Sequence, residues 1–418
     1  MPATYPPRSS AAVITLHDVS TRSRPMLAPL LALLFAGLAF YGARGSIGNL
    51  VLPWERAYGA SRGDVSLIAT VSFLAIGLAQ PIAGRLLETV AAWKLLTLGL
   101  TLGLVGYGGG AFAPNLLTAV VLVGAVGGFG GGLAANSTLS VMVTQLFRER
   151  QGAMFGLIGA ATAGGTMLLI PASSGVIDGI SRRAGLLFLA GSLALALLGV
   201  LLFLRVAGGG EAYTRPVKRV TVAGALHVRD FWLLAIPFFV CGITSTGITD
   251  PHLIPYMQGC HIGNGTASTI AAALAGFNVL GTLASGILSD RLDQRKMLAF
   301  IYLLRGVTLL LLPLLRSTEL LAAFAVVYGL ADFSTVPPTT KLAKSSFRNG
   351  GWALVLGLLG TAHQLGSALG GALGGFLYDQ TGGYGLFFVI SASTCIVAAA
   401  LSLGIGRAEP RVLVPAPA

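Results

Sequence analysis

Long uncharged runs of apolar residues recur along almost the whole 418-residue chain. A helix needs about 20 consecutive apolar residues to cross roughly 30 Å of hydrocarbon, and twelve runs approach or exceed that length. Only 10% of the residues are charged, against about 25% in soluble domains, which is too few for a water-soluble surface. The chain is therefore predicted to be an all-α membrane protein with twelve transmembrane helices. The predicted spans are residues 26–53, 65–84, 95–113, 115–146, 152–177, 185–206, 231–257, 266–288, 297–315, 319–343, 351–377 and 384–406.

The longest stretch between spans divides them six and six. It carries Gly208-Gly209-Gly210 followed by several basic residues. The first apolar run is too long for the apolar region of a cleaved signal peptide, so the residues before it are expected to form a tail. The expected parts are a cytoplasmic tail (1–25), an N-terminal six-helix bundle (26–206), a cytoplasmic linker (207–230), a C-terminal six-helix bundle (231–406) and a second tail (407–418).

The basic residues predict the orientation. Most of the 27 Lys and Arg residues fall on the side that carries both termini, and such an excess marks the cytoplasmic side. We therefore expect a multi-pass protein of the cell inner membrane with both termini cytoplasmic. The net charge of +12 is spread over loops, so no nucleic-acid partner is expected. The three cysteines have unrelated spacings, which suggests neither a metal site nor a cofactor site.

The two halves of the chain resemble each other in sequence. Gly45 and Pro53-Trp54 match Gly247 and Pro255-Tyr256 at an offset of 202 residues. At an offset of 201, three glycines and an aspartate near the end of span 5 match counterparts in span 11 (Gly156, Gly159, Gly165 and Asp178 with Gly357, Gly360, Gly366 and Asp379). Six spans per half give corresponding spans the same direction, so the sequence predicts a parallel repeat with a site between the bundles. Chance alignment of glycine-rich helices is the alternative.

The loop between spans 8 and 9 carries a recognisable motif. It reads Gly286-Ile-Leu-Ser-Asp290-Arg291-Leu-Asp293-Gln-Arg295-Lys296 and resembles the loop signature of the major facilitator superfamily. The resemblance implies the two-bundle fold of that superfamily and a gating role for Asp290, Arg291 and Arg295. A loop carboxylate can pair with basic groups at neighbouring helix ends and latch one state. A solvated turn is the alternative interpretation.

Two further segments look like the bacterial monocarboxylate-porter-like branch of that superfamily. They run from Phe238 to Pro255 and from Tyr328 to Thr339. That resemblance implies a small organic anion as substrate, often moved with a proton. Related carriers commonly place an Arg, or an Asp/Arg pair, in span 8, whereas residues 266–288 contain no charge.

Ionisable residues inside spans are costly unless they are paired or face water, so they mark candidate sites. Arg44 corresponds to Thr246 in the repeat, and Asp250 lies four residues further on the same helix face. Arg44 and Asp250 are therefore predicted to face each other across the central cavity. A guanidinium can bind a carboxylate with two parallel hydrogen bonds, which suits an organic anion. A purely structural ion pair is the alternative for Arg44.

Other polar residues in spans complete the predicted site. The expected substrate-binding residues are Arg44, Tyr41, Asn136 and His363, and the expected proton-coupling residues are Asp250 and His252. The alternative for Asn136 and His363 is that they are core residues whose polar groups are hydrogen-bonded within the protein. The alternative for Asp250 and His252 is that they are structural residues in contact with water. Asp332, before Pro337-Pro338, is predicted to have a gating role through a contact with Lys341 or with the other bundle. Arg305 is expected either to be paired or to extend its charge toward the membrane–water interface.

The resulting prediction is a secondary active transporter of a small organic anion, a monocarboxylate, working by alternating access with proton coupling. Its partners are the anion, protons and the bilayer, and it is expected to be monomeric. The alternative is a proton-driven efflux antiporter for drugs or lipophilic compounds. Such antiporters typically carry a Gly-x-x-x-Gly-Pro element in span 5, whereas Gly164-Gly165 here stand well before Pro171. An enzyme is not expected, because the chain lacks a nucleophile and base at catalytic spacing.

Overall fold

The computed structural model describes residues 27–87, 89–147, 151–205, 222–347 and 352–406, and within them every regular element is helical. Ten stretches are long and apolar enough to cross a membrane. Two glycine-rich helices, α5 (Ala92–Gly110) and α20 (Trp352–Thr381), bring the described total to twelve. The predicted all-α fold with twelve spans is therefore confirmed. Both predicted tails and residues 207–221 of the predicted linker lie outside the described residues.

Each predicted span coincides with one helix or a series of short helices. The first six spans are α2 (Leu27–Gly45) with α3 (Ile47–Tyr58); α4 (Arg62–Leu86); α5; α6 (Leu116–Ala119), η1 (Val120–Gly127), α7 (Gly128–Leu133) and α8 (Asn136–Leu146); α9 (Gln151–Gly179); and α10 (Arg182–Gly199) with η2 (Val200–Leu204). A short helix, α12 (Val222–Leu226), precedes the second half. The last six spans are α13 (Arg229–Thr244), α14 (Thr246–Thr249) and α15 (Leu253–Gly259); α16 (Asn264–Leu288); α17 (Gln294–Leu311) with η3 (Leu312–Leu314); α18 (Thr318–Asp332), η4 (Phe333–Thr335) and α19 (Val336–Ser346); α20; and α21 (Gly385–Leu403).

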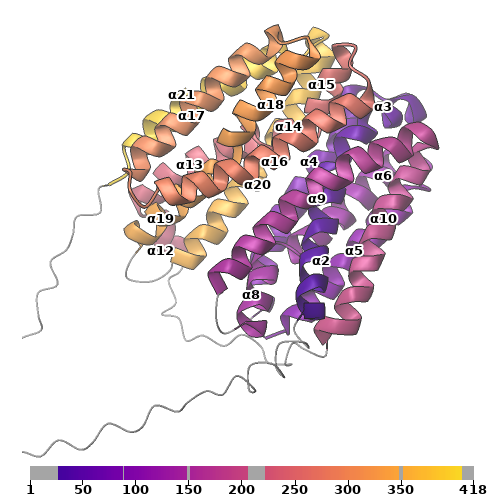
Figure 1. The fold of residues 1–418 in the computed structure, drawn as a ribbon. Coiled ribbons are helices and arrows are strands. Elements are labelled where there is room, and N and C mark those ends of the chain that lie inside the picture. Colours follow the sequence, from indigo (N-terminus) through magenta and orange to yellow (C-terminus); the bar gives the residue numbers. More distant parts are fainter. Residues whose placement is uncertain (1–26, 88, 148–150, 206–221, 348–351, 407–418) are drawn as a thin grey trace, which may run out of the picture.

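The buried apolar residues form two large cores. One contains residues between positions 32 and 204 together with Ala368. The other contains residues between positions 225 and 405 together with Ile170. Figure 1 shows the same division, with the indigo-to-magenta helices in one bundle and the salmon-to-yellow helices in the other. Each half of the chain thus folds largely around its own core, and each core extends across the interface to one residue of the other half.

Helix starts follow local capping signals. At α4, the Ser61 side chain accepts from the Asp64 backbone N–H and the Asp64 carboxylate accepts from Ser61, which is a complete capping box. Ser181 and Ser317 cap α10 and α18 in the same way through their hydroxyl oxygens. These caps fix where the helices begin. The first turn of α4 also takes part in the contact between the bundles.

Four spans are interrupted between their ends. Span 1 breaks at Ser46, span 4 at residues 134–135, span 7 at Ser245 and again at residues 250–252, and span 10 at residues 333–335. Ser245 has a non-helical backbone with φ −104° and ψ −102°. Breaks free backbone groups and are tolerated at this depth only where protein or a cavity surrounds them. These four interruptions are therefore expected to be surrounded by protein or by a cavity.

The predicted repeat is visible in helix packing. A Cβ added to Gly165 of α9 would collide with the carbonyl oxygen of Leu38 in α2. A Cβ added to Gly366 of α20 would collide with the carbonyl oxygen of Phe239 in α13. Both members of the second pair stand 201 residues after their counterparts. The glycines match because they occupy equivalent helix crossings, where only a residue without a side chain fits.

The bundles meet most closely at one end of the molecule. We call it the distal end; it is the end where α3 finishes and α4 begins, opposite the start of α2. Here α3 and α15 lie side by side (Figure 1), and a Cβ on Gly48 would stand 2.5 Å from the carbonyl oxygen of Asp250. The packing continues inward along α4 and α20 and along α9 and α16.

Candidate substrate site between the bundles

Arg44 and Asp250 form an ion pair that joins the two bundles. The Arg44 Nε lies 3.1 Å from the Asp250 Oδ2, and the side chains are 13% and 10% exposed. Arg44 stands in the last turn of α2, and Asp250 follows the short helix α14. The predicted meeting of these two side chains across the repeat is present in the structure.

The pair leaves most of the guanidinium available. The Nε and Oδ2 atoms lie at ion-pair distance without hydrogen-bond geometry. Among the described residues, no hydrogen bond from the Arg44 guanidinium is present. Its centre lies 5.2 Å from the centre of the Tyr41 ring. A cation with unused donors in a nearly buried position is suited to bind an anion from the cavity.

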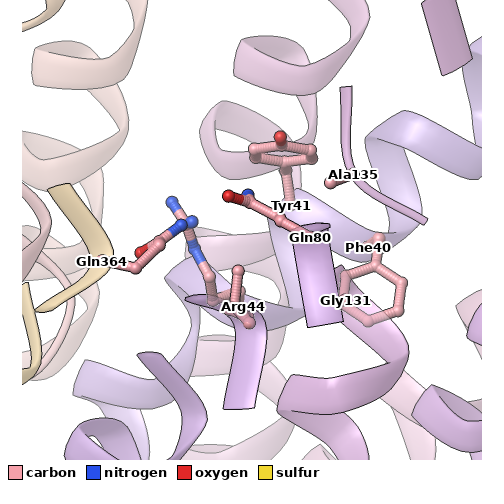
Figure 2. Close-up of a pocket in the computed structure, with 8 residues that line it drawn as sticks. Phe40, Tyr41, Arg44, Gln80, Gly131, Ala135 and Gln364 are labelled. Atoms are coloured by element: carbon pink, nitrogen blue, oxygen red, sulfur yellow. The ribbon is translucent and has the colours of Figure 1, made fainter. Parts of the chain in front are cut away.

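Arg44 lines a pocket that both bundles contribute to. The lining residues are Phe40, Tyr41, Arg44, Ile76, Gln80, Gly131, Ala135 and Gln364. The space inside, its open mouth included, is about 280 Å³. Figure 2 shows the Arg44 guanidinium between the amide groups of Gln80 and Gln364. The pocket therefore combines one cation with two neutral amides, a set suited to a small polar anion.

Gln80 and Gln364 were not among the residues predicted from the sequence. Gln364 is 8% exposed, and its Oε1 has no hydrogen-bond partner among the described residues. The prediction considered mainly ionisable residues within spans, and these two side chains are uncharged. The available signal was an amide inside an otherwise apolar span, because such a group also needs a partner in hydrocarbon.

The other predicted substrate residues are distributed around the pocket. Tyr41 lines it, and its role in substrate binding stays a prediction. Asn136 is the first residue of α8, directly after the lining residue Ala135, but its side chain lies outside the described part. His363 is not one of the lining residues; its Nε2 lies 3.3 Å from the Ser245 Oγ, and its ring packs 5.2 Å from that of Phe238. His363 therefore faces α13, while the next residue, Gln364, reaches the pocket.

His252 is fully buried and belongs to a chain of hydrogen bonds toward the distal end. Its Nδ1 is 3.2 Å from the Tyr384 Oη, and its Nε2 is 2.9 Å from the Gly371 carbonyl oxygen. A carbonyl only accepts, so Nε2 carries the proton and Nδ1 accepts from the tyrosine. Tyr384 in turn accepts from the Arg62 Nη1 at 2.8 Å. Both ring nitrogens are therefore occupied by protein groups, and the predicted proton-coupling role of His252 stays a prediction.

Arg305 and Asp332 form a buried pair within the C-terminal bundle. Arg305 is 0% exposed, and its Nη2 lies 3.9 Å from the Asp332 Oδ1. Its guanidinium also donates to the Cys241 Sγ, the Thr244 Oγ1 and the backbone oxygens of Ala331 and Asp332. Arg305 is thus paired, and its side chain does not extend to the membrane–water interface.

The partner predicted for Asp332 is wrong. Asp332 is 1% exposed and accepts from Asn278 Nδ2 of α16 at 3.2 Å, so both of its side-chain partners lie in its own bundle. Lys341 instead pairs with Asp290. A carboxylate buried mid-span needs a counter-charge at the same depth, which Arg305 supplies and Lys341, further along α19, does not. Gating by Asp332 stays a prediction.

The loop signature forms contacts at the helix ends. Asp290, 73% exposed, pairs with Lys341, 36% exposed, at the end of span 10, and Arg291 is exposed. Arg295 pairs with Asp293 at 2.7 Å, and the hydrogen bonds from Arg295 hold the pKa of Asp293 at about 2. All these contacts lie within one bundle. Exposed ion pairs contribute only about 0–1 kcal/mol to stability. These pairs alone are therefore too weak to account for the gating role predicted for Asp290, Arg291 and Arg295, which stays a prediction.

Two six-helix bundles, each around its own core, with a charged pocket between them, define a membrane carrier of the two-bundle class. Sequence comparison is consistent with that class. The sequence model of the Major Facilitator Superfamily matches residues 33–262 and 238–418. The chain therefore belongs to the major facilitator superfamily, whose members are transporters and not enzymes, and it is a multi-pass membrane protein.

Its relatives place it in the monocarboxylate-porter-like branch. The chain is 26% identical over 375 residues to an uncharacterized MFS-type transporter, YcxA, of Bacillus subtilis, covering 86% of this chain and 89% of the relative. It is 27% identical over 385 residues to monocarboxylate transporter 11 of Homo sapiens, covering 88% and 80%. Monocarboxylate transporter 13 of Rattus norvegicus is 23% identical over 376 residues, covering 87% and 85%.

Proposed function

We propose that the protein is a secondary active carrier that moves a small monocarboxylate across the cell inner membrane by alternating access, together with a proton. The observation that carries the proposal is the Arg44–Asp250 pair, which joins the bundles beside a pocket lined by two amides. The names of several relatives as monocarboxylate transporters support the same substrate class. The excess of basic residues on the side of the termini supports a cytoplasmic location for them.

In the proposed cycle, the substrate competes with Asp250 for Arg44. A carboxylate entering the pocket takes the free fork of the guanidinium with two parallel hydrogen bonds. Asp250 then loses its counter-charge in a nearly dry position, where a bare carboxylate is costly, so it takes up a proton. The empty site holds Arg44 with ionised Asp250, and the loaded site holds Arg44, the anion and neutral Asp250. Both are electrically neutral, so either form can cross between the two states.

The alternative, proton-driven efflux of drugs, has less support. The pocket beside Arg44 is lined by a cation and by two side-chain amides. Arg44, Gln80 and Gln364 also give it more polar groups than a lipophilic ligand can satisfy. A small anion uses these groups.

The test of the anion site is substitution of Arg44 in purified protein reconstituted into liposomes. Lysine keeps the charge but loses the planar fork. Counterflow of a radiolabelled monocarboxylate such as lactate or acetate should fall by at least about tenfold in Arg44→Lys, and should be lost in Arg44→Ala. Arg183→Lys changes an exposed arginine at the start of α10 and should transport normally. Counterflow of monocarboxylates by Arg44→Ala at the unmodified rate would end the anion-site proposal.

A further inference from the structure

Two aspartates related by the repeat make the same kind of contact with opposite bundles. Asp178, near the end of α9, accepts from the Asn264 Nδ2, which lies 3.0 Å from each carboxylate oxygen. Asp379, near the end of α20, accepts from the Arg62 backbone N–H at 3.1 Å and the Gly63 backbone N–H at 2.8 Å. Asn264 begins α16 and Arg62 begins α4. At the distal end, each bundle therefore presents a carboxylate to the first turn of a helix in the other.

The start of α4 is incomplete without Asp379. The first N–H groups of a helix have no partner within the helix and form its positive end. The capping box satisfies the Asp64 N–H through the Ser61 hydroxyl. The two donors before it, on Arg62 and Gly63, are satisfied by Asp379 of the other bundle. The N-terminus of α4 is thus fully capped only when the bundles touch.

The Arg62 side chain makes contacts that can be released. It is 6% exposed, and its charge is paired with Glu55 of its own bundle. Across the interface it meets neutral groups: it donates to the Tyr384 Oη at 2.8 Å and lies 4.4 Å from the Tyr378 ring centre. Separating the bundles therefore leaves no charge of Arg62 unpaired, which would otherwise make the movement costly.

The backbones approach closely at this point. A Cβ on Gly63 would stand 2.5 Å from the Asp379 Oδ2, and a Cβ on Gly375 would stand 2.9 Å from the Gly63 Cα. A Cβ on Gly375 would also stand 2.5 Å from the Ser66 Oγ. At Gly375 only glycine fits without movement of the helices, and at Gly63 a larger residue would displace the Asp379 carboxylate. The contact of Asp379 with α4 is therefore part of a tightly packed helix crossing.

We propose that Asp379 and Asp178 form a two-point clamp that closes the distal end of the carrier. The clamp rests on the alternating access of the proposed function. Both aspartates are exposed, so when the distal end opens each carboxylate returns to water and only its hydrogen bonds are lost. Asp379 is the stronger point, since it binds two backbone donors beside the buried Arg62, whereas Asp178 binds one side-chain amide.

The test measures access to the interface beneath the clamp. Ser66, 1% exposed on α4, is replaced by cysteine in a background with Cys260→Ser, which removes the partly exposed native thiol. Membrane vesicles of either orientation are treated, without substrate, with an impermeant maleimide. Asp379→Asn should raise the rate of labelling of Ser66→Cys from the distal side by at least about tenfold, the equilibrium effect of losing a hydrogen bond to a charged group. Asp178→Asn should raise it less.

The matched control is Asp64→Asn, which removes a carboxylate in the same first turn that bonds only to Ser61 of its own bundle. It should leave labelling unchanged. Equal increases in Asp64→Asn and Asp379→Asn, or an unchanged rate in Asp379→Asn and Asp379→Ala variants that elute as single monodisperse peaks, would overturn the clamp. No substrate is used, so a wrong substrate assignment does not affect the labelling rates. The outcome of the Arg44 test likewise does not predict the outcome of the labelling test.

Discussion

Two arginines inside the described spans, Arg44 and Arg305, differ in what surrounds them. Arg305 has five partners, all in its own bundle, and no exposure. Arg44 has one charged partner, Asp250, which lies in the other bundle, and a pocket in front of it. An arginine that donates to several groups of its own bundle stabilises the fold, whereas an arginine with unused donors at a cavity is available to a ligand. This difference supports the proposed binding role of Arg44 and a structural role for Arg305.

Substitution of Asp250 by Asn should separate coupling from binding. An amide cannot carry the proton, but Arg44 still offers its fork to the substrate. We expect Asp250→Asn to keep most exchange of substrate for substrate in liposomes and to lose accumulation driven by a pH gradient. Full gradient-driven uptake by this variant would remove Asp250 from the mechanism and leave the proton to His252 or to the substrate itself.

At the scale of elements, the interrupted and the continuous helices position different groups. The breaks in α2–α3 and α13–α15 place Arg44 and Asp250 beside the pocket. The continuous helices α9 and α20 run from the glycine crossings near the cores to Asp178 and Asp379 at the distal end. Spans 1 and 7 therefore supply the ion pair, and spans 5 and 11 reach the contacts between bundles at the distal end.

The glycine crossing in the N-terminal bundle can be tested on two neighbouring residues. A Cβ on Gly165 would collide with the Leu38 carbonyl oxygen, while a Cβ on Gly164 would meet nothing within 4 Å. Gly165→Ala should lower stability by roughly 1–3 kcal/mol because α2 and α9 must separate. Gly164→Ala should be neutral or stabilising by up to about 1 kcal/mol, since alanine favours a helix. Thermal unfolding in detergent measures both, and equal melting temperatures would contradict the crossing.

At the scale of the whole molecule, the repeat gives the carrier two related contacts at the distal end and one asymmetric site between the bundles. Asp178 and Asp379 are related by the repeat, and so are the helix starts that they bind. Arg44 has threonine, Thr246, as its counterpart. The symmetric contacts suit opening and closing, and the asymmetric charges suit binding of a single anion.

The charge balance of the proposed cycle predicts electroneutral transport. Empty and loaded carriers have the same net charge at the site, because the anion and the proton on Asp250 cancel. Uptake into liposomes should therefore respond to a pH gradient and be unchanged when a potassium gradient with valinomycin imposes a membrane potential of either sign. Uptake that follows the membrane potential would show that the proton and the anion do not move in a one-to-one ratio.

The sequence alone determined the spans, the division into two bundles, the repeat and the meeting of Arg44 with Asp250. Hydrocarbon imposes its requirement on each segment separately, so the length and polarity of a run are enough to identify a span. The Arg44–Asp250 pair was also accessible, because the repeat offset and the helical period together place both residues on facing helices.

The tertiary structure decided which polar groups meet between helices. The partner of Asp332, the amides of Gln80 and Gln364 in the pocket, and the capping of α4 by Asp379 all join residues that are distant in the chain. Such contacts depend on the rotation and depth of each helix. These are set by side-chain packing and close glycine crossings, not by local hydropathy. The sequence placed Asp379 at the end of a span, and only the packing of α20 against α4 brought it to the donors of the other bundle.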